Sequence, residues 1–367
     1  MKKLTALLLT AALLLTISCS DSSTEPKPTA NPVQEFESQT GTVNSDMNEM
    51  MATTSVTAMT ANMGALQQLP FMGSGKDKVL SALSGFKKYD SKNMLAFLPV
   101  SQNVKRDAIP FDFSSHCGTY NWNSQLQQWD VTTGGTSIVV NFPATATSTT
   151  NNAVFTWSKY AEALVNLEIP GESTVEQVYM PTEMEMDFKI NGTTEAALDF
   201  SAAYRNNGIP SAMSLDLLLN PFTLYASMTS QEKQIDMTLK LKKAAAELYN
   251  LSVNLKFLDT NYEVIDDVTA TLSRGDLTFY AFGNVDALAN LEVNSNEEMI
   301  AALNNKTNLD CQIKVSGNKV ADLRFKLVTS GTNPVYETMM PYFLFTNGTE
   351  MSIAELMNKL FPQGTLK

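Results

Sequence analysis

The chain has 367 residues, of which 44% are hydrophobic, and its 38 Asp and Glu outnumber its 26 Lys and Arg. The resulting net charge of −12 argues against a nucleic-acid-binding protein, because contacts with phosphates require a basic surface. The hydrophobic fraction is normal for a globular protein, and the chain is long enough to bury a large core.

The N-terminus has the pattern of an export signal. Two lysines precede an apolar run from Leu4 to Ile17, which is shorter than the roughly 20 residues of a membrane-spanning helix. The run ends in Ser18-Cys19, and residues 1–25 resemble the lipobox-type signal peptide of bacterial lipoprotein precursors. The resemblance implies that residues 1–18 are removed, that lipid is attached to Cys19, and that the protein is held in the cell envelope, at the outer membrane.

Residues 19–42 are rich in Ser, Thr and Pro, and we predict that they form a lipidated flexible tether. Residues 43–100 are predicted to be a helical Met-rich segment, since Met47, Met51, Met59 and Met63 recur at multiples of four. The intrinsic helix propensity of this Met- and Thr-rich segment is modest, so its stability must come from packing on another element.

From residue 101 to 367 the apolar period changes to two. In residues 178–190, for example, the methionines and Phe188 take one parity while Glu, Asp and Lys take the other, as expected for antiparallel strands with one dry face. Turn sequences such as Asn191-Gly192 separate about a dozen such runs. Helices are predicted at residues 294–303 and after Glu350, where Gly348-Thr349-Glu350 is expected to cap the C-terminal helix.

The fold class predicted from these elements is α+β and mostly β. We expect a long, curved, half-barrel-like antiparallel β-meander, with the N-terminal helices packed on its apolar face and a short C-terminal helix. The physical reason is that a one-sided sheet of this size would expose more apolar surface than soluble monomers do, so something must cover it.

If the helices cover that face only in part, the remainder would form a cavity for a lipid or another apolar small molecule. The residues predicted to line the cavity share the apolar parity of their strands. They are Met180, Met184, Met186, Met213, Met237, Phe257 and Phe282.

The two remaining cysteines, Cys117 and Cys311, leave two alternatives open. An exported compartment permits a disulfide between them. However, Cys311 lies on the apolar parity of its strand, where it would equally well be a small buried thiol.

Nothing in the sequence predicts an enzyme, a cofactor or a metal site. His116 is the single histidine, and its neighbour Cys117 would point to the opposite face of a strand. Residues 73–76 lack the first glycine of a phosphate-binding loop, and residues 259–267 lack the central glycine and the closing glutamate of a calcium loop.

The function expected from the sequence is therefore a non-enzymatic, lipid-anchored protein that binds an apolar ligand inside its sheet. One alternative is a structural or adhesive surface lipoprotein with a fully packed core. A weaker alternative is a glycan-binding protein that uses Trp122, Trp129 and Trp157. The expected partners are the membrane, through the lipid, and an apolar small molecule; the sequence specifies no protein partner.

Overall fold

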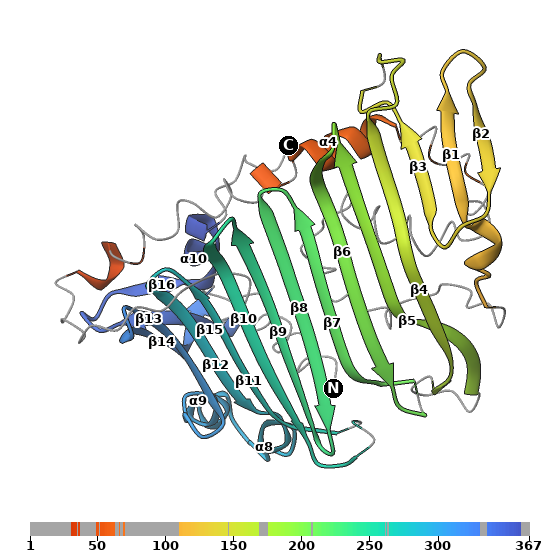
Figure 1. Ribbon diagram of the computed structural model, residues 1–367. Coiled ribbons are helices and arrows are strands. Elements are labelled where there is room, and N and C mark those ends of the chain that lie inside the picture. Colours follow the sequence, from red (N-terminus) through yellow and green to blue (C-terminus); the bar gives the residue numbers. More distant parts are fainter. Residues whose placement is uncertain are drawn as a thin grey trace. The chain divides into compact units, whose positions relative to one another are not determined.

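The computed structural model describes residues 31–34, 36, 49–50, 52–62, 66, 69, 110–145, 147–168, 175–206, 208–260, 262, 264–330 and 336–360. Within these residues the protein is mostly β, and its 16 strands form one open sheet with few helices (Figure 1). The predicted mostly β, chiefly antiparallel class is confirmed.

The strands follow one another in sequence order from β3 to β16, and β1 lies between β3 and β2. β1 (Gly118–Asn123) pairs antiparallel with β2 (Gln128–Thr133) but parallel with β3 (Ile138–Phe142). The predicted meander is therefore interrupted at its start. Gly118 is needed there, because a Cβ at this position would lie 2.4 Å from the carbonyl oxygen of Thr132 on the neighbouring strand.

The chain divides into two compact units. Unit 1 contains residues 225–367 and the described residues up to Met50, and unit 2 contains residues 51–224. The boundary falls within β8 (Phe222–Gln231), inside the segment 101–367 that we predicted as a single sheet domain. Alternation along the strands continues across this point, so the sequence has no feature that marks it.

Unit 2 contains helix α4 (Thr54–Ala61), the 3-10 turn η3 (Ser114–His116) and the first seven strands. After β1 to β3 these are β4 (Ala153–Glu168), β5 (Val175–Ile190), β6 (Thr193–Tyr204) and β7 (Pro210–Leu219). Its core joins Phe142, Trp157 and Phe188 to Ala58 of α4 and to Leu69. A short helix thus lies against the apolar residues of the sheet, as predicted; the methionines expected to line it lie outside the described side chains.

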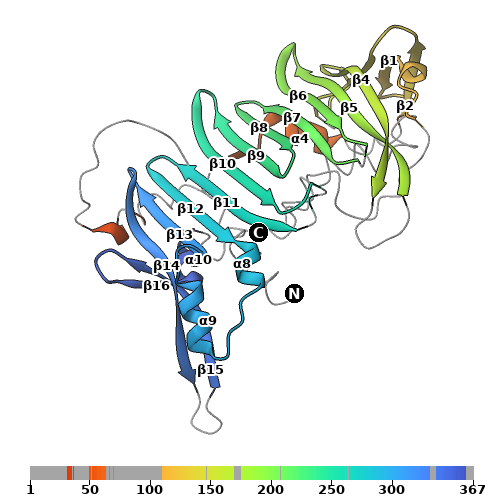
Figure 2. The same cartoon turned by 90° about the horizontal axis from the view of Figure 1, so that it is seen from below.

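Among its described residues, unit 1 contains most of β8, and β9 to β16, with helices between and after these strands. The strands are β9 (Gln234–Lys243), β10 (Ala246–Phe257), β11 (Ile265–Arg274), β12 (Leu277–Asn284), β13 (Leu309–Val315), β14 (Asn318–Ser330), β15 (Tyr336–Phe345) and β16 (Glu350–Ser352). Helices α8 (Val285–Ala289) and α9 (Asn296–Leu303) lie against β11 and β14 (Figure 2). Of these two helices, the sequence predicted only α9.

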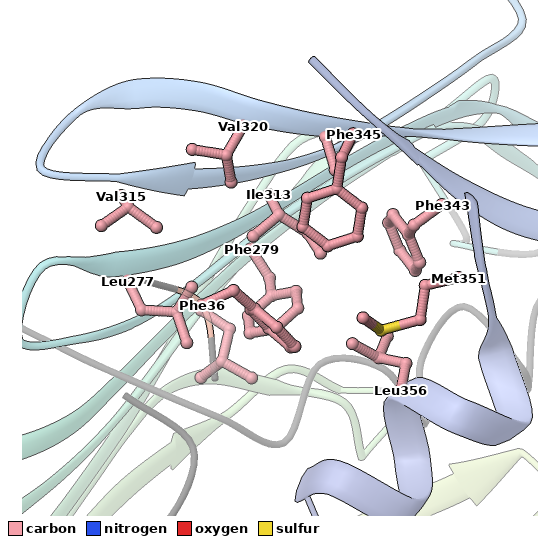
Figure 3. Packing of buried hydrophobic residues seen from close by; sticks show 12 residues of the cluster. Phe36, Leu277, Phe279, Ile313, Val315, Val320, Phe343, Phe345, Met351 and Leu356 are labelled. Carbon is pink, nitrogen blue, oxygen red and sulfur yellow. The ribbon is translucent and has the colours of Figure 1, made fainter. Parts of the chain in front are cut away.

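The core of unit 1 is built around Phe36, which is completely buried (Figure 3). Its ring packs edge-on against Phe279 and Phe345, with centroids 6.3 and 6.1 Å away. Leu356 of helix α10 (Ile353–Leu360) is buried in the same cluster. Phe36 belongs to the segment predicted as a tether, so the folded part of the chain starts before residue 43.

The predicted C-terminal helix is present, but its N-terminal cap differs from the expected one. The hydroxyl of Ser352 accepts a hydrogen bond from the N–H of Glu355, and the Glu355 carboxylate accepts one from the N–H of Ser352. This reciprocal pair is a capping box. The predicted cap at Gly348 to Glu350 instead forms the turn and the short strand β16 that precede it.

Candidate functional site

A continuous apolar surface crosses β5, β6 and β7 in unit 2. Residues opposite each other in the ladder share a face, and the register aligns Met186 with Leu198 and Leu217, and Met184 with Phe200 and Leu215. Ala202 and Met213 form the next row. We call this set the β5–β7 apolar surface: Met184, Met186, Leu198, Phe200, Ala202, Met213, Leu215 and Leu217.

On this surface Met186 is buried, and the other seven residues are partly buried. Met186 belongs to the buried core of unit 2. Large side chains such as Phe200 and Leu217 therefore keep part of their area accessible, while Met184 and Leu198 of the same surface pack against the core of unit 2. Such a surface can gain free energy by burying more apolar area, at roughly 25 cal/mol per Å².

The opposite face of the same strands is polar. Glu185, Asp199 and Asp216 lie opposite one another across β5, β6 and β7, and all three are exposed. Like charges at directly opposite positions are mildly destabilising, and exposure to water limits this repulsion. These three carboxylates thus lie on the face opposite to the apolar surface, together with a few apolar residues such as Leu218.

The structure groups three of the predicted lining residues, Met184, Met186 and Met213, on the β5–β7 apolar surface. Met180 is buried in a separate cluster with Val165 and Val178, against which Tyr204 packs. The Tyr204 hydroxyl donates to the carbonyl of Pro181 at 2.9 Å, and burial raises its pKa to about 12. Met180 is therefore a core residue of unit 2.

In unit 1 the remaining predicted lining residues do not share one environment. Met237 is partly buried opposite Val253, on the face that also carries Ala270 and Ala281. Phe257 is buried, and its ring lies 5.0 Å from that of Tyr262.

The prediction for Phe282 is wrong. Phe282 pairs with Thr269 and Asp310 and so lies on the polar face, opposite to its neighbour Ala281. The reason is that aromatic residues occupy both parities of β12, at Phe279, Tyr280 and Phe282, and alternation alone cannot assign them. The register set by the β11–β12 hairpin decides that Phe279 faces the core.

An aromatic cluster in unit 2 surrounds a carboxylate that the sequence analysis missed. The ring of Phe111 stacks on Trp157 at 5.5 Å and on His116 at 5.3 Å. Glu162 accepts a hydrogen bond from the N–H of Phe111 at 2.5 Å and one from the hydroxyl of Tyr160 at 2.6 Å. Burial, with the hydrogen bond to Glu162, raises the pKa of Tyr160 far above its ordinary value. The sequence could have indicated this pair, because Tyr160 and Glu162 are two residues apart in a strand and so lie on the same face.

Replacing Glu162 with glutamine is expected to destabilise unit 2. Glutamine offers one acceptor oxygen where the carboxylate offers two, and its amide group would face a donor. We expect the free energy of unfolding to fall by about 1–3 kcal/mol, because one charge-assisted hydrogen bond is lost and two donors then face each other. Urea unfolding followed by tryptophan fluorescence measures the change.

Glu183→Gln is the matched control, because Glu183 forms an ion pair with Lys159 while both side chains remain exposed. Exposed pairs contribute about 0–1 kcal/mol. Equal losses of stability in the two variants would contradict a structural role for the Glu162 carboxylate.

Cys117 and Cys311 are both buried free thiols, so the disulfide alternative is wrong. Cys117 lies in unit 2 and Cys311 in unit 1. Burial raises the pKa of Cys311 to about 12 and also raises that of Cys117. Both thiols therefore stay protonated near neutral pH, where the thiolate would be the reactive form.

The remaining candidate chemistry has structural explanations. Asp259 accepts a hydrogen bond from the N–H of Val264, and Asp267 pairs with Lys256, so these carboxylates organise the β10–β11 connection and β11. His116 ends the turn η3 and stacks on Phe111. Among the described residues, no group of three His, Cys, Asp or Glu side chains is placed to hold a metal ion.

Cys19 lies outside the described residues, as do residues 73–76. In the part of the chain that the structure describes, no helix is both long enough and apolar enough to cross a membrane. Comparisons of the chain with family models, with curated proteins and with solved structures found no match. The functional argument therefore depends on the residues of this chain alone.

Proposed function

We propose that the protein is a non-enzymatic, lipid-anchored component of the bacterial cell envelope, at the outer membrane, that binds an aliphatic chain or another apolar small molecule. The site is the β5–β7 apolar surface. One observation carries the proposal: large apolar side chains on three adjacent strands stay partly accessible, on a face that is continuous with the buried core of unit 2 at Met186.

The composition of the surface favours a flexible apolar ligand. Leucine and methionine predominate, and the unbranched methionine side chains of Met184 and Met213 adapt to irregular apolar shapes. The rows align along neighbouring strands about 4.8 Å apart, so an extended chain lying across them would contact one side chain from each strand.

The alternative of a structural or adhesive protein requires this surface to be an ordinary part of the core. The glycan-binding alternative is less favoured, because Trp157 is only 4% exposed and Trp122 and Trp129 pack against the core of unit 2. Their rings also contact each other edge-on, with centroids 5.1 Å apart.

Two adjacent alanines provide a matched test of the site. Ala202 lies on the β5–β7 apolar surface, and Ala203, the next residue of β6, is exposed on the opposite face. We expect Ala202→Trp to weaken binding of cis-parinaric acid, a fluorescent fatty acid, at least tenfold, because the indole occupies the space of the ligand. Titration with direct excitation of the fatty acid measures the dissociation constant.

Ala203→Trp should leave that dissociation constant within twofold of the wild type, although it adds the same side chain to the same strand. Thermal unfolding of both variants shows that the fold is retained. If the wild type binds no fatty acid, or if both variants bind it equally well, the proposed site is wrong.

The lipid anchor has its own test. Cys19→Ala should abolish incorporation of radiolabelled palmitate during growth and release the protein from the membrane fraction, because the thiol is the acceptor of the lipid. Cys117→Ala is the control, since this thiol is buried in unit 2. Continued labelling of the Cys19 variant would rule out the anchor without affecting the ligand site.

A further inference from the structure

Strand β2 ends the sheet on the side of unit 2, and Figure 1 shows it as the last arrow there. Five of its six residues are exposed, and Val131 is 48% exposed. Exposed edges are normally protected by lysine, proline, a bulge or a very short strand. β2 has none of these features: its sequence is Gln-Trp-Asp-Val-Thr-Thr, and its register with β1 is continuous.

The strand at the other end of the sheet order, β16, has features that protect an edge from pairing with another strand. β16 has three residues, helix α10 follows it directly, and Glu350 pairs with Lys326. By comparison, β2 is twice as long, and no other strand of the described residues pairs with its outer side. Such an edge is a template for pairing with another strand.

The backbone hydrogen bonds show which residues of β2 face outward. The N–H of Gly134 donates to the carbonyl of Cys117, and on the other side of β1 the N–H of Gly118 donates to Ser137. Because bonded and non-bonded pairs alternate in an antiparallel ladder, Asp130 and Thr132 bond to β1. The N–H and C=O groups of Val131 and Thr133 therefore point away from the sheet.

We propose that β2 pairs antiparallel with β2 of a second copy of this chain, with Val131 opposite Val131. Outward-facing residues must meet outward-facing residues, which any pairing centred on a single residue satisfies. Only centring on Asp130 or on Val131 pairs five of the six residues of β2. Centring on Val131 places Trp129 opposite Thr133 and Asp130 opposite Thr132. Each of these pairs is favourable, since aromatic and β-branched side chains meet and a hydroxyl faces a carboxylate.

The competing register is disfavoured by charge. Centring on Asp130 would place the two Asp130 carboxylates directly opposite each other, which is destabilising. Asp130 is the one ionisable residue in β2, so a shift by one residue decides between repulsion and a hydrogen bond. Of the two registers that pair five residues, β2 is therefore self-complementary in the one centred on Val131.

The apolar face also continues across this pairing. Val131 lies opposite Tyr120, and Trp129 opposite Trp122, on the face that carries the core of unit 2. Joining two β2 strands at Val131 would bring the exposed valines together and extend that apolar face from one copy into the next. A six-residue edge buries less than a standard interface, so we expect weak, concentration-dependent association.

Cysteine cross-linking of the full chain tests the register. In the proposed pair the two Val131 Cα atoms lie about 5.5 Å apart, within disulfide range. Two Thr132 residues would be offset by about 7 Å along the strands and about 5 Å across them, beyond that range. Under mild oxidation, Val131→Cys should form a covalent dimer at least fivefold faster than Thr132→Cys and than the wild type, which controls for the native cysteines.

Proline at position 131 tests the edge without cross-linking. Because the N–H of Val131 points away from β1, Val131→Pro leaves the hairpin bonds intact and removes the donor at the centre of the dimer. Sedimentation equilibrium should show a concentration-dependent dimer for the wild type and a monomer for this variant, with unchanged unfolding midpoints. A wild type that stays monomeric, equal cross-linking of both cysteine variants, or a cross-link to a different protein would overturn the proposal.

Discussion

Replacing Phe36 with alanine is expected to lower the unfolding free energy of unit 1 by about 3–5 kcal/mol. The side chain has no exposed area, and its ring contacts Phe279 of β12 and Phe345 of β15. Removing it leaves a cavity under the sheet that the surrounding strands, held by their ladders, can fill only in part. Urea unfolding measures the loss, and hydrogen exchange should accelerate in β12, β13 and β15.

Val33→Ala is the control for this prediction, because Val33 is only partly buried against the same cluster. It should cost clearly less than Phe36→Ala. A loss of less than about 1 kcal/mol for Phe36→Ala would mean that Phe36 is not part of the core, since buried Phe→Ala substitutions cost about 3–5 kcal/mol. In that case the tether predicted from the sequence would extend through residue 36.

The second large effect is expected for Trp157→Ala in unit 2, again about 3–5 kcal/mol. The indole is buried between rings: it stacks on Phe111 and makes edge contacts with Phe113 and Tyr160, with centroids 5.2 to 5.5 Å apart. Its N–H donates to the carbonyl of Lys159 at 2.9 Å. The substitution therefore removes apolar burial, several ring contacts and a hydrogen bond together.

Trp157→Phe separates these contributions, because phenylalanine keeps a ring in the cluster but lacks the N–H donor. We expect it to recover at least half of the loss. Trp129→Ala should cost less, since Trp129 is partly buried on the edge strand β2. If the Trp129 variant were as unstable as the Trp157 variant, the aromatic cluster around Phe111 would not be the stabilising centre of unit 2.

Most of the sheet could be predicted because its signal is local. Along residues 178–190 and 249–257 apolar and polar side chains alternate, and Asn191 and Gly192 adopt the positive φ angles, 51° and 82°, that a tight hairpin needs. The start of the sheet could not be predicted this way. The parallel pairing of β1 with β3 depends on contacts between strands, which alternation within one strand does not encode.

The sheet face of the candidate residues was predicted in part for the same reason. Met184, Met186 and Met213 share one face, as the alternation in their strands predicts, and their role as ligand-lining residues stays a prediction. Phe282 was misplaced because β12 has aromatic residues on both faces. Phe36 was missed because a single aromatic residue in a polar segment has no periodic neighbours, and only the tertiary structure shows that it completes the core of unit 1.

The most direct test of the ligand proposal is native mass spectrometry of the full chain purified from its own host. We expect the wild type and Ala203→Trp to retain an added mass that dissociates as a lipid or another apolar molecule, and Ala202→Trp to lose it. A wild-type protein that carries no such mass, under conditions that preserve the fold, would contradict the account and favour a purely structural role.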